Sequence, residues 1–198
     1  MVRWYHATIS AYGFWLPNDP RGSWSDFVAP YELFRYGGPA TKTDQRRSLA
    51  HDRHDAALRR ETKRHLNYPP VRFNDAQRQA IIDGFGRACV EGGIEVLAGC
   101  IGFDHGHVMV ARHASKTIEQ IVGHLKSRAT QALTAAGCHP LAAYADAAGV
   151  VPTPWAGGCW KVFIDDPVQM RAAVEYDRRH AAKEGLPEQV WPFVRPIV

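Results

Sequence analysis

The order of strand and helix patterns limits the fold more than any other feature. A strand pattern covers Arg3 to Tyr12, with Ala7 and Ile9 on one side and His6 and Thr8 on the other. After residue 70 the signals become regular. They predict a helix at 74–93, strands at 94–101 and 105–112, a helix at 117–137, a strand at 158–164 and a last helix at 166–184.

This order is β-α-β-β-α-β with an added helix, which is typical of a ferredoxin-like α+β fold. We expect an antiparallel sheet with helices on one face. The other face would be free for a ligand or a partner. The turn Gly102-Phe103-Asp104 joins the second and third strands as a hairpin.

Length and composition agree with one domain spanning residues 1–198. The chain has 198 residues, of which 45% are hydrophobic, enough for a substantial core. No apolar run approaches the roughly 18–20 residues of a membrane span, so we expect no integral membrane protein. The start of the chain lacks a signal-peptide pattern, and the 4 cysteines lie far apart. We therefore predict a cytoplasmic protein without disulfides or a cysteine-zinc site.

Positive charge is concentrated in one segment, which we treat as a basic insertion at 41–70. The chain has a formal net charge of +4. Between Thr41 and His65 stand 8 Lys/Arg and 4 acidic residues, a difference of 4 that equals the whole surplus. Such an excess is typical of a surface that binds polyanions. The alternative is a solvated, partly helical segment of mixed charge.

The first candidate for chemistry is the pair His105 and His107. Residues two apart in a strand point to the same face, so both imidazoles can hold one divalent metal ion. A pair of this kind also arises by chance in a chain with 10 histidines. Two exposed histidines on a sheet face are therefore the alternative.

The second candidate lies on the last helix, where Tyr176 and His180 are four residues apart and share a face. A metal ion held by His105, His107 and His180 can polarise a phosphodiester and stabilise the leaving 3′-oxygen. Tyr176 would then attack phosphorus and become linked to the 5′-phosphate of the DNA. The alternative is a half-buried helix tyrosine with a structural hydrogen bond.

These motifs resemble the single-tyrosine HUH transposases, most closely the REP-associated tyrosine transposases and their insertion-sequence relatives. The resemblance extends from the two ends of the chain to its middle, but nothing comparable covers 42–70 or 137–157. The similar segments are Tyr12–Pro17, Asp19–Ser23, His105–His107, Leu125–Arg128, Glu175–His180, Lys183–Pro187 and Val190–Val194.

The resemblance implies a ferredoxin-like domain that cleaves and rejoins single-stranded DNA at ends flanked by hairpins. It implies that Tyr176 is the nucleophile and that His105 and His107 bind Mg²⁺ or Mn²⁺. The family's Gln or Asn ligand, one turn after the tyrosine, corresponds to His180. Family members include dimers that share active sites, so a homodimer is one option, and the protein would act at the bacterial nucleoid.

Two residues depart from the family pattern. Gly106 stands where the family has a bulky hydrophobic residue, and it points away from the histidines, so we expect thinner packing without loss of a ligand. His180 replaces an amide ligand. An all-histidine site is softer, which favours competition by Co²⁺ or Ni²⁺.

Further residues are candidates for contact with DNA. Basic side chains can bind phosphates, and aromatic side chains can stack on unpaired bases. Trp15 can equally close the edge of the core. The candidates are Trp15, Arg21, Trp24, Lys126, Arg128, Lys161 and Lys183.

Two other functions remain open at this point. The chain can be a domesticated protein that binds DNA hairpins without cleaving them. Alternatively, the three histidines can serve a metal-dependent hydrolase that uses water as the nucleophile, with Tyr176 only orienting the substrate.

Overall fold

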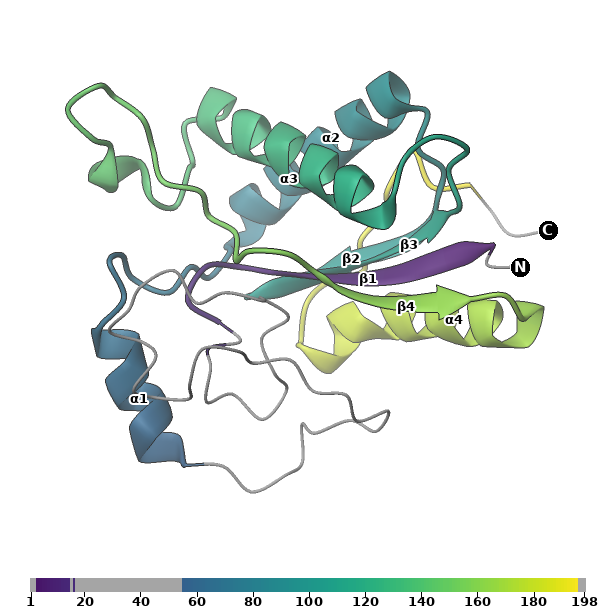
Figure 1. Ribbon diagram of the computed structural model, residues 1–198, viewed down its shortest axis with the longest axis horizontal. Helices are drawn as coiled ribbons and strands as arrows, with labels where there is room; N and C mark the ends of the chain where they lie inside the picture. The colour runs from purple at the N-terminus through teal and green to yellow at the C-terminus, as the bar shows by residue number, and fades with distance from the viewer. Residues whose placement is uncertain (1–2, 15, 17–54, 196–198) are drawn as a thin grey trace.

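A computed structural model describes residues 3–14, 16 and 55–195 of the chain (Figure 1). The predicted elements all form, and the expected insertion contributes one further helix, α1. The elements are β1 (Trp4–Ser10), α1 (Ala56–Arg64), α2 (Asp75–Gly92), β2 (Val96–Ile101), β3 (His105–Ala111), α3 (Ile118–Ala135), the short 3-10 helix η2 (Ala142–Tyr144), β4 (Trp160–Ile164) and α4 (Pro167–Lys183).

The four strands form one sheet in the order β2-β3-β1-β4, and every neighbouring pair is antiparallel. This topology confirms the predicted ferredoxin-like α+β fold. The register places Thr8 of β1 opposite His107 of β3, and Ser10 opposite His105. Consequently the polar side of β1 runs beside the two strand histidines.

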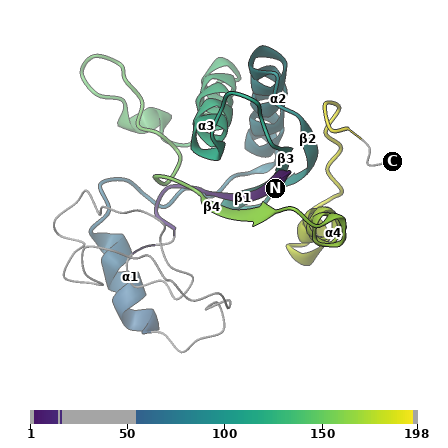
Figure 2. The same ribbon diagram turned by 45° about the vertical axis from the view of Figure 1, so that its right-hand side comes forward.

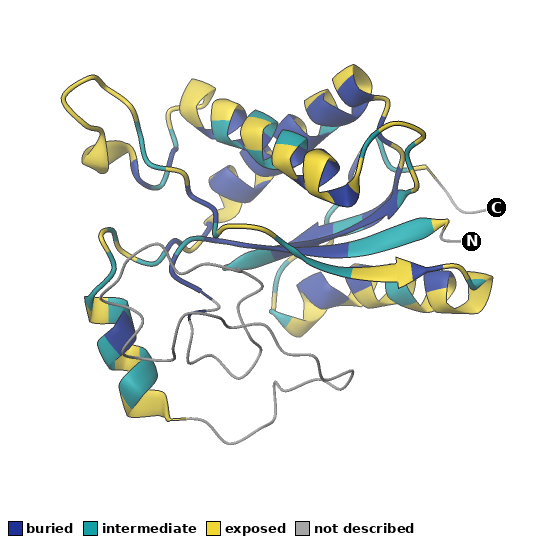
Figure 3. Cartoon of the chain, in the orientation of Figure 1, coloured by how far each residue is buried: buried dark blue, intermediate teal, exposed yellow. Residues whose placement is uncertain are grey.

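Helices α2 and α3 pack together on one face of the sheet (Figure 2). Each begins with a capping box, in which the N-cap side chain accepts a hydrogen bond from the backbone N–H three residues later. The side chain of that later residue accepts one from the N-cap backbone N–H in return. Ile9, Val108 and Val110 project from the sheet into this layer, where they meet apolar side chains such as Phe85 and Leu125. The buried sides of the elements therefore face each other across the larger core (Figure 3).

Helix α4 lies on the opposite face (Figure 2), which we had expected to be free. That expectation was wrong, because the helix carries enough apolar side chains to close a second, smaller core. Met170 and Val174 of α4 pack there with Leu97, Met109 and Ile164 of the sheet. The helix thus holds the side chains on its inner face against the polar side of β1 and β3.

The segment after α4 returns along the outer edge of β2. The side-chain amide of Gln189 donates to Ile101 O at 2.6 Å, and its oxygen accepts from Ile101 N at 2.8 Å. The ring of Trp191 occupies the space where a side chain on Gly99 would lie. The segment therefore covers the edge of the sheet next to α4.

Two predicted absences can be compared with the described residues. No helix among them is long and apolar enough to cross a membrane. All four cysteines are described, and each is a free thiol.

Candidate metal and tyrosine site

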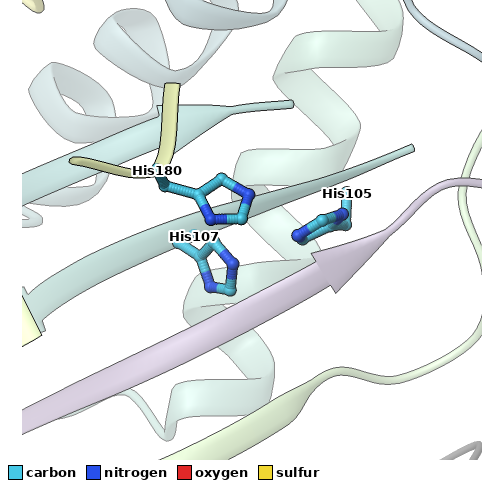
Figure 4. Close-up of side chains that lie close together, drawn as sticks. All are labelled: His105, His107 and His180. Carbon is cyan, nitrogen blue, oxygen red and sulfur yellow. The ribbon is translucent and has the colours of Figure 1, made fainter. Parts of the chain in front are cut away.

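Three histidines from two separate segments meet between the sheet and α4 (Figure 4). His105 and His107 project from β3 on one side, and His180 projects from α4 toward them. The ring centroids lie 4.9 Å apart for His105 and His107, 4.8 Å for His105 and His180, and 4.5 Å for His107 and His180. One nitrogen of each ring lies within 4.8 Å of the others, which is a separation that one metal ion can bridge.

The two strand histidines are oriented by their other ring nitrogens. Nδ1 of His105 lies 2.7 Å from Oδ1 of Asp104. Nδ1 of His107 lies 3.1 Å from Oγ1 of Thr8. Hydrogen bonds of this kind fix the ring and the tautomer of a metal-binding histidine, which leaves Nε2 available as the ligand atom.

The remaining nitrogens fit a cation. Nε2 of His107 and both ring nitrogens of His180 are buried and have no hydrogen-bond partner among the described residues. Burial, reinforced by His105, holds the pKa of His107 well below its usual range. Burial also lowers the pKa of His180. Both rings are therefore neutral at pH 7, as metal coordination requires.

Tyr176 lies one turn before His180 and contacts the same cluster. Its ring centroid is 5.2 Å from that of His107, edge to face, and 5.6 Å from that of His180. The side chain is still 40% exposed, so a substrate can reach it. Burial, with a smaller effect of Asp177, raises the pKa of Tyr176. The phenol is therefore protonated at neutral pH and needs activation to act as a nucleophile.

A hydrogen-bonded pair beside the tyrosine, His6 and the buried Asp177, was not predicted from the sequence. Nε2 of His6 lies 2.7 Å from Oδ1 of Asp177, and the His6 ring stacks on His107 with centroids 5.3 Å apart and planes at 9°. Burial raises the pKa of Asp177, although its bond to His6 acts in the opposite direction. The only signals were a histidine on the polar side of the first strand and an acid next to Tyr176.

Glu184 was also missed, although it stands one turn after His180. Its Oε2 accepts a hydrogen bond from the backbone N–H of Phe103 at 3.0 Å. Its Oε1 lies 3.6 Å from Nε2 of His180. The carboxylate thus lies at the edge of the histidine cluster, next to the turn that leads into β3.

The basic residues predicted to bind DNA have varied surroundings. The Lys126 ammonium donates to the backbone carbonyls of Ala156 at 2.7 Å and Gly158 at 2.5 Å. Burial lowers the pKa of Lys126 to about 8. This lysine therefore joins α3 to the segment before β4, and this structural contact is separate from the predicted contact with DNA phosphates.

The other described candidates have different partners from Lys126. Arg128 pairs with Glu91 at 2.5 Å, and Lys161 pairs with a glutamate of α3. Lys183 lies at the histidine cluster, with its ammonium 4.6 Å from the ring centroid of Tyr176. Three further predicted residues, Trp15, Arg21 and Trp24, lie outside the described residues.

Comparisons with known proteins give one family match and one similar solved structure. No curated protein matches the sequence. Among solved structures, the chain is similar to a REP-associated tyrosine transposase bound to a REP hairpin, with 13% sequence identity, a TM-score of 0.48 and coverage of 97% of this chain and 74% of that one. Residues 66–142 match the sequence model of a family described as "Transposase IS200 like".

The matched segment contains both strand histidines and ends before α4 begins. Tyr176 and His180 therefore lie outside it, and the family match does not bear on them. Residues 66–142, less than half of the chain, are thus similar to the family described as "Transposase IS200 like".

Proposed function

We propose that this protein cleaves and rejoins single-stranded DNA through a covalent link between Tyr176 and a 5′-phosphate. The observation that carries the proposal is the edge-to-face contact of Tyr176 with His107, whose ring centroids lie 5.2 Å apart. The nucleophile and the three candidate ligands belong to one chain, so the proposed reaction requires no residue from a second subunit.

The proposed substrate is a DNA strand flanked by a hairpin, at the bacterial nucleoid. The relation of residues 66–142 to transposases supports DNA as the substrate class. The surplus of basic residues in the insertion supports it as well, since a local positive field attracts a polyanion. Hairpin recognition and a dimeric assembly remain part of the proposal, based on the resemblance.

His105, His107 and His180 would hold the divalent cation through ring nitrogens. Bound there, Mg²⁺ or Mn²⁺ neutralises phosphate charge and acts as a Lewis acid toward the scissile phosphodiester. Three nitrogen ligands also suit Co²⁺ and Ni²⁺, which bind imidazole more strongly than Mg²⁺ does. Thr8 and Asp104 keep the two strand imidazoles aimed at the site.

The chemical step forms one bond to phosphorus and breaks one. The Tyr176 oxygen attacks the phosphorus atom, the bond to the 3′-oxygen breaks, and the 5′-phosphate remains on the tyrosine. The phenol proton is lost to solvent or a base, and the 3′-oxygen takes up a proton to become a hydroxyl. Rejoining reverses these steps with an incoming 3′-hydroxyl. The protein holds the phenol in position for this attack. The hydrogen bond between His6 and Asp177 joins α4, which carries Tyr176, to β1.

The test uses a single-stranded DNA hairpin labelled on the 3′ side of the cleavage site, with Mg²⁺ or Mn²⁺. We expect a protein–DNA adduct with the wild type and none with Tyr176→Phe. Tyr144→Phe is the matched control, because Tyr144 is 43% exposed and lies outside the histidine cluster. It should form the adduct at the wild-type rate.

Two other outcomes would assign the alternative functions. Tight hairpin binding without any adduct would indicate a protein that binds DNA without cleaving it. Cleavage that Tyr176→Phe retains but His107→Ala loses would indicate a hydrolase that uses water. Either outcome would contradict the tyrosine mechanism.

A further inference from the structure

Helix α4 and its C-cap residue present three candidate side chains to the same site at intervals of four residues: Tyr176, His180 and Glu184. The third closes the side of the cluster next to the β2–β3 turn. Its carboxylate groups with Asp104 and His105 through ligand atoms within 4.8 Å of one another, a set that shares only His105 with the three-histidine set. Oε1 of Glu184 lies 3.6 Å from Nε2 of His180.

We propose that Oε1 of Glu184 is a fourth protein ligand of the cation, so that the site is composed of three histidines and one carboxylate. This inference rests on the proposed metal centre. Two ligands bound to one ion at about 2.1 Å lie about 3.0–3.5 Å apart, depending on tetrahedral or octahedral geometry. The 3.6 Å between Oε1 and Nε2 of His180 matches this spacing. It is longer than a hydrogen bond, so the two groups form an i,i+4 ion-pair contact that leaves room for a cation between them.

The other end of the carboxylate is already fixed. Oε2 accepts from the backbone N–H of Phe103 at 3.0 Å. Gly102 makes room for this approach, because a Cβ at that position would collide with the Glu184 carboxylate. One oxygen is thus bonded to the turn that precedes His105, while the other lies 3.6 Å from Nε2 of His180, which has no hydrogen-bond partner among the described residues.

A carboxylate changes the preference of the site. Three neutral imidazoles leave the full charge of the cation uncompensated and select for Co²⁺, Ni²⁺ and Zn²⁺. An anionic oxygen ligand adds Coulomb attraction and suits Mn²⁺ and Mg²⁺. Glu184 would therefore restore the oxygen donor that His180 lacks, and removing its charge should weaken Mn²⁺ more than Ni²⁺.

The experiment measures Mn²⁺ and Ni²⁺ affinity by calorimetry on the full-length wild type, Glu184→Gln, Glu184→Ala and Glu175→Gln. The first variant keeps the acceptor for Phe103 but removes the charge. Glu175→Gln is the control, because this exposed glutamate on the same helix pairs with Arg179 at 2.5 Å, away from the cluster. We expect Mn²⁺ binding to weaken at least about tenfold in both Glu184 variants, as for changes around a metal site. The control should retain wild-type affinity.

The absorption spectrum of bound Co²⁺ gives a second measurement. It should differ between wild type and Glu184→Gln, because loss of a carboxylate changes the ligand field, and it should be unchanged in Glu175→Gln. Equal Mn²⁺ affinities and identical Co²⁺ spectra in Glu184→Gln and the control would overturn the proposal. Melting of the metal-free proteins reveals any variant that fails to fold. In that case the Co²⁺ spectrum of Glu184→Asp is measured instead, because this variant keeps the charge but draws the carboxylate back on a shorter side chain. A spectrum that differs from the wild type supports the proposal, and an identical spectrum overturns it.

This test separates the ligand from the reaction. If the wild type forms the Tyr176 adduct but Glu184→Gln binds metal like the control, only the assignment of Glu184 is wrong. If metal affinity depends on Glu184 but no adduct forms, the assignment of Glu184 stands and the tyrosine mechanism is wrong.

Discussion

Nε2 of His6 lies 2.7 Å from Oδ1 of Asp177, and this hydrogen bond joins β1, the strand between β3 and β4, to α4. The Asp177 side chain is fully buried, and the His6 ring stacks on His107. Because Asp177 directly follows Tyr176, the bond also restricts where the phenol lies. One side-chain pair thus positions the candidate nucleophile and supports a candidate metal ligand.

Replacing Asp177 should therefore affect both stability and the reaction. We expect Asp177→Ala to lower the free energy of unfolding by about 1–3 kcal/mol, because it leaves His6 without its partner in a buried site. Asp177→Asn keeps an acceptor oxygen and should cost less. Urea denaturation measures both variants, and Asp165→Ala, at an exposed position, is the control. The adduct should form more slowly in Asp177→Ala even where the protein is fully folded. A loss of stability no larger than in the control would contradict this role.

The metal-free protein should become less stable as the pH falls below neutral. The pKa values of His107 and His180 are lowered in the folded state, mainly by burial. Between those lowered values and the ordinary histidine pKa of about 6.5, the unfolded chain binds more protons, so stability rises with pH. We expect a lower melting temperature at pH 5.5 than at pH 7.5.

His107→Gln tests this effect, because it removes the buried histidine whose pKa is held well below its usual range. The melting temperature of the variant should change less between the two pH values than that of the wild type. Parallel profiles for the two proteins would show that burial of His107 does not cause the dependence.

Lys126 should prove more important for stability than an ordinary surface lysine. Its ammonium donates to the carbonyls of Ala156 and Gly158, and it is charged at pH 7. Lys126→Met should cost about 1.5–3 kcal/mol, the range for hydrogen bonds that involve a charged group. Arg128→Met removes a partly exposed ion pair and should cost less than about 1 kcal/mol. If Lys126→Met loses DNA affinity but no stability in urea, the lysine acts on phosphate and not on the fold.

Gly106 should tolerate a side chain only if Ile101 gives way. Gly106 points to the α2–α3 face, and a Cβ there would lie 2.7 Å from Cδ1 of Ile101. We expect Gly106→Val to destabilise by about 1–3 kcal/mol through overpacking. Adding Ile101→Val removes that methyl group and should recover part of the loss. Thermal melting of the two single variants and the double variant measures the coupling, and strictly additive effects would contradict this account of the glycine.

The sequence predicted the elements of the fold well because their signals are local. Asn74 with Gln77 and Thr117 with Gln120 form the capping boxes that their spacing indicates. The strand alternation that puts His105 and His107 on one face is local as well, as is the one-turn spacing of Tyr176 and His180. Each of these relationships depends on a few consecutive residues.

The relationships that were missed depend on how distant segments pack. His6 and Asp177 are 171 residues apart in sequence, and only the packing of α4 on the sheet brings them together. The face chosen by α4 could not be predicted because its apolar side chains, such as Met170 and Val174, fit either side of a sheet by composition alone. Once α4 lies there, Glu184 necessarily comes to the turn beside Phe103.

The central claim is that one cation lies among His105, His107 and His180, next to Tyr176. The most direct test is a crystal structure of the protein soaked in Mn²⁺, with the ion located by its anomalous scattering. The account predicts one strong peak within about 2.0–2.4 Å of a ring nitrogen of each histidine. A peak coordinated by His6 and Asp177 instead, or one from which His180 is turned away, would contradict it.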